Sequence, residues 1–231
     1  PPISTLFPYT TLFRSKNSFV FVPLVFSRNL FDYELASLSV LAFISFCLIS
    51  STVYIINDIN DIEADSSHPI KKMRPIAAGE ISISTALIIA AVLMILNGFI
   101  FLQLNSYFII SALVFFLINI FYTFSFKYVV ILDIFSIAAG FVMRVIAGAV
   151  AIDVEISSWL MLTTMFLSLF LAVMKRRSEL EIVKVEDIQK TRKVLQNYSI
   201  AFIDQMATVA AAGVIICYAL YTVSERTVFI F

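Results

Sequence analysis

Charged residues are scarce in this sequence, and they are missing altogether from several long stretches. Only 14% of the 231 residues are charged, whereas 61% are hydrophobic, and sixteen bases balance sixteen acids. A net charge of zero gives no bulk attraction to nucleic acid, so we expect no nucleic-acid partner. The hydrophobic fraction lies well above about 45–50%, the usual value for soluble domains, which argues against an ordinary soluble domain.

The gaps between charges are long enough to cross a membrane, which takes about 20 apolar residues. The windows without any charge are 35–56, 81–102, 107–126 and 158–174. Windows 131–152 and 200–223 are similar in length and carry three charges between them. With a shorter apolar run at 18–31, the sequence predicts about seven membrane segments. Helices satisfy their own backbone polar groups in lipid, so we predict an all-α polytopic transmembrane bundle.

Cysteine is almost absent, and the first residues do not resemble the rest. Cys47 and Cys217 lie in apolar windows, so no disulfide framework is expected. Residues 1–15, PPISTLFPYTTLFRS, lack an initial Met and resemble translated sequencing-adaptor sequence. We therefore set them aside and expect a single transmembrane domain over 16–231. We expect the natural domain to extend beyond both ends of this sequence.

Lys and Arg concentrate in alternate loops between the predicted segments. Loops 57–80, 125–130 and 175–199 hold eleven of them, and the intervening loops hold only Arg28. Cytoplasmic loops carry an excess of Lys and Arg, so the pattern predicts that these three loops face the cytoplasm. The expected location is the plasma membrane, with the polar face on the cytoplasmic side.

Acidic residues cluster in NDINDIEADSSHPIKKMRPIAAGEIS, residues 57–82. Asp58, Asp61 and Asp65 are spaced i, i+3, i+7, so on a helix they share one face, and Asn57 lies at its edge. Three carboxylates on one face repel one another unless a cation lies among them. Oxygen ligands favour Mg²⁺ or Ca²⁺ over zinc, and Mg²⁺ is usually held by one or two carboxylates together with substrate phosphates.

Basic residues follow the acids directly, and a magnesium–diphosphate site would need them. His68, Lys71 and Arg74 could neutralise phosphate oxygens that a metal does not reach, Arg in bidentate fashion. The alternative is a solvated loop whose charges only set the topology. Topology accounts for the bases but not for the acids, so we favour metal–diphosphate binding.

The motif NDINDIEAD resembles the NDxxDxxxD motif of the UbiA-type intramembrane prenyltransferase superfamily. Its continuation, HPIKKMRPIAAG, is similar to one branch, the decaprenyl-phosphate phosphoribosyltransferases. The similarity extends from KNSFVFVPLVFS, which begins at Lys16, to LQNYSIAFIDQM. Members of this family usually have nine membrane helices, so this sequence would lack the start of the first helix and the last two.

The resemblance implies a catalytic domain that transfers 5-phosphoribose from phosphoribosyl diphosphate to a polyprenyl phosphate lipid. Diphosphate is released, and the product serves the synthesis of cell-envelope polysaccharide precursors. Asn57, Asp58, Asp61 and Asp65 would hold Mg²⁺ on the donor diphosphate, where the metal stabilises the leaving group. The expected partners are the two substrates and the membrane, and a homo-oligomer is compatible with the sequence.

Further residues match this branch in the two later basic loops. Lys175, Arg176 and Glu179 in KRRSEL, and Tyr122 and Lys127 in YTFSFK, are expected to contact donor phosphate. The alternative for the bases is that they anchor the topology. The second Asp-rich motif found elsewhere in the superfamily is missing from KRRSELEIVKVED, which leaves a second metal site without support.

Arg144 is a charge inside a predicted membrane segment. Charges there are costly, so they face a cavity or a partner. Asp133, Gly140 and Arg144 recur at helical spacing on a face rich in small residues, which packs closely against neighbouring helices. We therefore predict that Asp133 and Arg144 line the substrate site. The alternative is an ion pair between Arg144 and Asp133 or Asp204 that only fixes the packing.

Two other functions remain open. A UbiA-type aromatic prenyltransferase would use the Asp motif to bind a polyprenyl diphosphate donor, but it would also need the second Asp-rich motif. A membrane transporter would carry charges through its spans or at broken helices near the midplane. Most charges here lie at one face, which favours the phosphoribosyltransferase.

Overall fold

The computed structural model describes residues 16–67, 71–183 and 198–230, and these residues contain helices but no strand. The adaptor-like residues 1–15 lie outside this part of the chain. The long helices are α4 (Tyr33–Asn60), α6 (Ile83–Phe101), α7 (Ser106–Phe124), α8 (Leu132–Ala151), α9 (Ser158–Val183) and α10 (Ile200–Val223). All six are long and apolar enough to cross a membrane. The predicted all-α transmembrane bundle is confirmed.

The seventh predicted membrane segment, 18–31, does not form a spanning helix in the described residues. It holds the 3₁₀-helix η1 (Ser18–Phe21) and the five-residue helix α3 (Val22–Phe26). Arg28 then adopts a positive φ of 60°, and Asp32 caps the start of α4 through the amides of Glu34 and Leu35. The turn and the cap reverse the chain before the apolar run can cross a bilayer, so six helices in the described part of the chain, not seven, are long enough to span.

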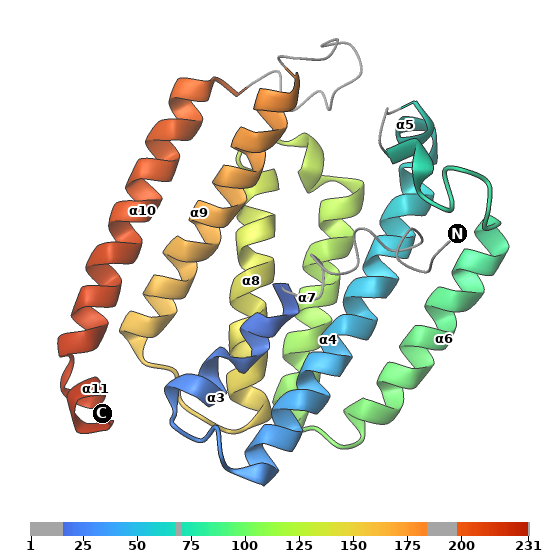
Figure 1. Ribbon diagram of the computed structural model, residues 1–231. Helices are drawn as coiled ribbons and strands as arrows, with labels where there is room; N and C mark the ends of the chain where they lie inside the picture. The colour runs from blue at the N-terminus through green and yellow to red at the C-terminus, as the bar shows by residue number, and fades with distance from the viewer. Residues whose placement is uncertain (1–15, 68–70, 184–197, 231) are drawn as a thin grey trace.

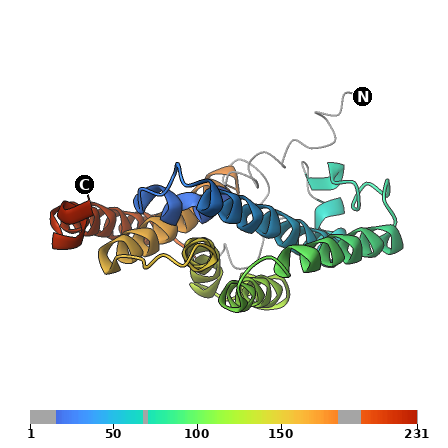
Figure 2. The ribbon, with the colours of Figure 1, turned by 90° about the horizontal axis from the view of Figure 1, so that it is seen from below.

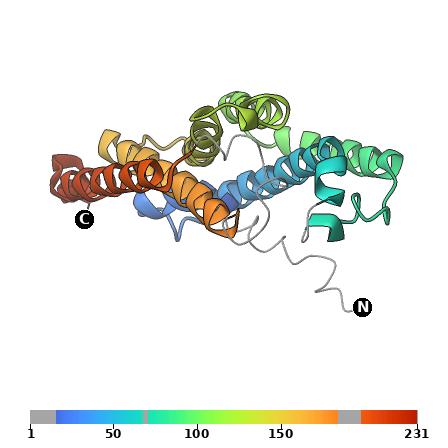
Figure 3. The same ribbon diagram turned by 90° about the horizontal axis from the view of Figure 1, so that it is seen from above.

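The six long helices lie side by side in the order α10, α9, α8, α7, α4, α6 (Figure 1). End views show α7 and α8 on one side of the molecule and η1, α3 and α4 on the other (Figures 2 and 3). Phe46 of α4 fills the space between these two sides, with its ring 4.8 Å from Phe115 and 6.0 Å from Phe108. The short N-terminal helices η1 and α3 pack against α8, in the middle of the bundle.

Gly148 allows η1 to approach α8 closely. A Cβ atom at Gly148 would lie 2.0 Å from the Val20 carbonyl oxygen, which is too close for any side chain. We expect Gly148→Ala to destabilise the protein by about 1–3 kcal/mol, as overpacking does, and to lower the Tm in detergent. Gly98→Ala in α6 is the matched control, since a Cβ there meets no atom within 4 Å. A Gly148→Ala protein that melts with the wild type would contradict this close contact.

Candidate active site

The acidic motif lies where α4 ends and the short helix α5 (Ile62–Ser66) begins. The helix predicted to run through all three carboxylates is interrupted by a turn at Asp61, although the backbone amides of Asp61 and Asp65 still donate to carbonyls four residues earlier. Asp58 and Asp65 converge on Arg74, whose Nη1 lies 2.7 Å from Asp58 Oδ1 and 2.6 Å from Asp65 Oδ2. One positively charged nitrogen therefore bridges two carboxylates that are seven residues apart.

Asp61 points to a different base, contributed by the connection between α7 and α8. Lys127, in the 3₁₀-helix η3 (Phe126–Tyr128), places its Nζ 2.5 Å from Asp61 Oδ1 and is only 2% exposed. We predicted that Lys127 contacts donor phosphate, but its ammonium is enclosed and already paired. Its arrangement supports a different role, in which Lys127 orients Asp61.

Magnesium fits this donor set at Asp58 and Asp65. Within the described residues, no three acidic, His or Cys side chains gather around one point. The Arg74 nitrogen nevertheless shows that two carboxylates can reach a single cation, and two carboxylates with substrate phosphates are a usual Mg²⁺ environment. Asn57 is half-buried beside Asp58 at the end of α4. Asp58 and Asp65 are thus the residues that would hold the metal, with Asp61 and Asn57 next to them.

A second polar cluster is centred on Arg176, which is fully buried. Helix α9 continues to Val183, so KRRSEL is helical and not a loop as predicted. Arg176 Nε lies 2.6 Å from Asp133 Oδ2, Nη2 donates to the Tyr122 hydroxyl over 2.9 Å, and Nη1 pairs with Glu179. Tyr198 donates its hydroxyl to Asp133 Oδ1 over 2.5 Å.

Arg176 and Asp133 are therefore placed differently from what the sequence predicted. Both side chains are 0% exposed and form an ion pair with each other, so neither is presented to a donor phosphate. They join α8 to α9, together with Tyr122 and Glu179. Tyr198 was missed, although it lies in the NYS of the similar region. Burial, followed by its hydrogen bond to Asp133, raises the pKa of Tyr198, so its hydroxyl stays protonated and donates.

The remaining predicted phosphate contacts lie at the same end of the bundle as the acidic motif. Lys175 is exposed on α9 next to Arg176, and Lys71 is partly exposed in the 3₁₀-helix η2 (Lys71–Met73). His68 lies outside the described residues. Lys71 and Lys175 are therefore the predicted bases whose side chains an incoming phosphate could reach.

Arg144 lies deep in the bundle, halfway along α8, and is 6% exposed. Its Nε donates to Asn17 Oδ1 over 2.8 Å and its Nη1 to the Gly140 carbonyl over 2.6 Å. The ion pair considered as an alternative is not formed. Asp133 pairs with Arg176, and Asp204 lies 2.7 Å from Arg177. Asn17 was missed by the sequence reasoning, although it belongs to the KNSF stretch that carries the resemblance.

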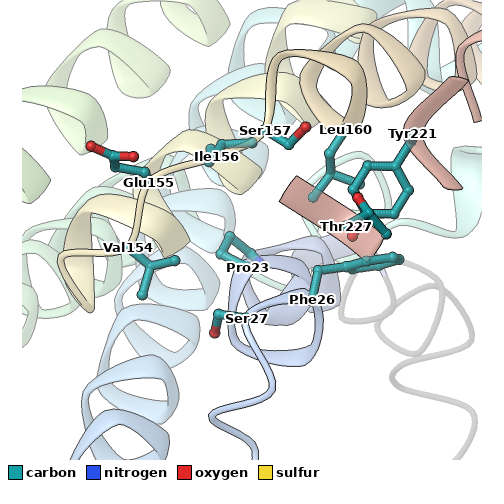
Figure 4. A pocket seen from close by; sticks show the side chains of 10 residues that line it. All are labelled: Pro23, Phe26, Ser27, Val154, Glu155, Ile156, Ser157, Leu160, Tyr221 and Thr227. Carbon is teal, nitrogen blue, oxygen red and sulfur yellow. The ribbon is translucent and has the colours of Figure 1, made fainter. Parts of the chain in front are cut away.

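A pocket of about 200 Å³ lies at the other end of the molecule (Figure 4). It is lined by α3, the connection between α8 and α9, the end of α10 and the short helix α11 (Glu225–Ile230), and includes Phe26, Tyr221 and Thr227. None of the predicted site residues lines it. We therefore place the candidate active site at the acidic end and in the bundle centre.

The sequence and the helical bundle match known proteins. Residues 19–229 match the UbiA prenyltransferase family, so the chain belongs to this family of transferases. It is similar to the UbiA homolog from Archaeoglobus fulgidus bound to DMAPP and Mg²⁺, with a TM-score of 0.70 and 18% identity over 94% of this chain and 80% of that one. The same homolog bound to GPP and Mg²⁺ gives a TM-score of 0.72, with 20% identity over 92% and 77% of the two chains.

Curated relatives point to one branch of the family. The decaprenyl-phosphate phosphoribosyltransferase of Mycolicibacterium smegmatis is 36% identical over 84% of this chain and 61% of the relative. The enzyme of the same name from Corynebacterium glutamicum is 36% identical over 78% of this chain and 55% of the relative. The chain thus spans less than two thirds of the length of these relatives.

Proposed function

We propose that this protein transfers 5-phosphoribose from phosphoribosyl diphosphate to a polyprenyl phosphate, with magnesium, and releases diphosphate. The main support for the proposal is that Asp58 and Asp65 both contact one positively charged nitrogen, Nη1 of Arg74. The names of the curated relatives support this choice of substrates. A role in cell-envelope precursor synthesis, with the acidic end facing the cytoplasm from the plasma membrane, follows from the same resemblance and from the basic loops.

The residues at the acidic end have separable tasks in this reaction. Bound magnesium would neutralise charge on the leaving diphosphate. Asp58 and Asp65 would hold the metal, and Arg74, which now pairs with both carboxylates, would then be available to bind phosphate oxygens in bidentate fashion. Lys127 holds Asp61 in place. Lys71 and Lys175 lie at the same end of the bundle, and they are the candidates to bind the 5-phosphate at the far side of the ribose.

A choice between two donors tests the proposal. The full-length protein, purified with lipid and Mg²⁺, should consume phosphoribosyl diphosphate when polyprenyl phosphate is present and form a phosphoribosylated lipid, followed by mass spectrometry. The parallel reaction offers polyprenyl diphosphate with aromatic acids. Turnover only in the parallel reaction would replace the proposal by the aromatic prenyltransferase, and a protein that uses neither donor would contradict both functions.

A further inference from the structure

Arg144 is a charge without a carboxylate partner in the middle of a membrane bundle. Among the described residues, no acidic side chain lies within ion-pair distance of its guanidinium, and the groups that it binds are neutral. The rings of Phe115 and Phe141 lie 4.6 Å and 5.6 Å from its Cζ. A buried cation without a counter-ion is costly, because desolvation is not repaid by an opposite charge.

Part of the guanidinium remains available to a ligand. Nη2 has no hydrogen-bond acceptor in the described part of the chain, and it is not among the fully enclosed atoms that lack a partner. It is therefore not fully enclosed by the described residues. The other two nitrogens are fixed by Asn17 and Gly140, which holds the guanidinium in one orientation.

A second base lies close to Arg144. Lys16 Nζ lies 6.0 Å from the centre of the same Phe141 ring that Arg144 contacts, and Asn17, the next residue, binds Arg144 directly. Burial, followed by the charges of Lys175 and Arg144, lowers the pKa of Lys16 to about 8. Two positive side chains from separate segments thus share this part of the bundle.

Arg144 and Lys16 lie at a depth in the bundle that suits one substrate in particular. Asn17 accepts a hydrogen bond from Ser50 of α4, which lies eight residues, or about 12 Å, below Asp58 along the helix. In an in-line displacement, the acceptor attacks the anomeric carbon from the side opposite the leaving diphosphate. A diphosphate at Asp58 and Asp65 therefore places the sugar, and then the acceptor, toward the centre of the bundle.

We propose that Arg144 and Lys16 bind a phosphate monoester at mid-membrane depth, namely the head group of the polyprenyl phosphate acceptor. This assignment rests on the proposed function, since it names the substrate bound at the inner half of the same site. The phosphate supplies the missing counter-ion, and its apolar tail remains among the membrane helices. Asn17 positions Arg144 and does not itself contact the lipid.

The test measures lipid binding without turnover, so it does not depend on whether transfer occurs. Binding of polyprenyl phosphate and of the uncharged polyprenol is compared by native mass spectrometry in detergent, with phosphoribosyl diphosphate binding measured separately. The wild type should prefer the phosphate to the alcohol. Arg144→Met should weaken phosphate binding by about 10- to 100-fold, the size expected for a lost charge-assisted hydrogen bond, and leave alcohol binding unchanged.

Asn17→Asp provides a second variant that is expected to fold. It places a carboxylate beside Arg144, so it should raise the Tm and also displace the lipid phosphate. If Arg144→Met and Asn17→Asp both keep the wild-type preference for phosphate over alcohol, Arg144 only fixes the packing. If the two variants instead weaken the binding of phosphoribosyl diphosphate, the site binds the 5-phosphate of the donor. If polyprenyl phosphate binds as proposed but no transfer occurs, only the proposed function fails.

Discussion

Asp58→Asn should lower phosphoribosyl transfer by about 100- to 1000-fold, the usual cost of removing a group that stabilises charge in the transition state. Asp58 shares Arg74 with Asp65, so the substitution removes a proposed metal ligand but leaves Arg74 a carboxylate partner. We therefore expect the fold to survive and the Tm to stay within a few degrees of the wild type. The measurements are turnover with Mg²⁺ and the affinity for Mn²⁺, followed by its magnetic resonance signal.

Glu63→Gln is the matched control for Asp58→Asn. Glu63 is an exposed carboxylate in α5, within the same acidic stretch, so its loss changes the local charge equally. Turnover and Mn²⁺ affinity should stay near wild type in this variant. An equal loss in both variants would mean that total negative charge matters and not the placement of Asp58. A chelator should also stop turnover, and an enzyme that resists chelation contradicts the magnesium site.

Arg176→Met should destabilise the protein by about 3–5 kcal/mol, because it leaves the fully buried Asp133 without its counter-ion. Arg177→Met is the matched control one position along α9. Arg177 pairs with Asp204 at 2.7 Å, but these side chains are 34% and 47% exposed, so the expected loss is below about 1 kcal/mol. Thermal unfolding in detergent measures both variants.

A double variant separates structure from donor binding at Arg176. Adding Asp133→Asn to Arg176→Met removes the stranded charge and should restore part of the lost stability. The variants would behave differently if Arg176 bound a phosphate of the donor. In that case Arg176→Met would keep its Tm, lose donor affinity, and gain nothing from the change at Asp133.

The sequence predicted the six long helices well because every helix that crosses a bilayer needs about 20 predominantly apolar residues. Windows such as 131–152 and 200–223 differ by only one residue or less at each end from α8 and α10. Pairing between distant side chains is not visible in such a pattern. Asp61 pairs with Lys127, which is 66 positions away, and no local spacing reports that contact.

The buried side chains of Arg144 and Arg176 are a second case in which the sequence pattern does not report the partners. Composition places Arg144 and Arg176 near apolar segments, but only the three-dimensional structure shows that Arg176 has a carboxylate and that Arg144 does not. The sequence predicted that Arg176 contacts donor phosphate and that Arg144 lines the substrate site. Burial and pairing now divide their roles, with Arg176 holding helices together and Arg144 keeping a nitrogen available.

The docking of η1 against α8 has a consequence for how the protein is assembled. Most helix contacts join neighbours along the chain, such as α7 with α8 and α9 with α10, so they can form as each helix leaves the ribosome. The hydrogen bond from Arg144 to Asn17 instead joins residues 127 positions apart. The N-terminal segment must therefore wait at the membrane until α8 has been inserted.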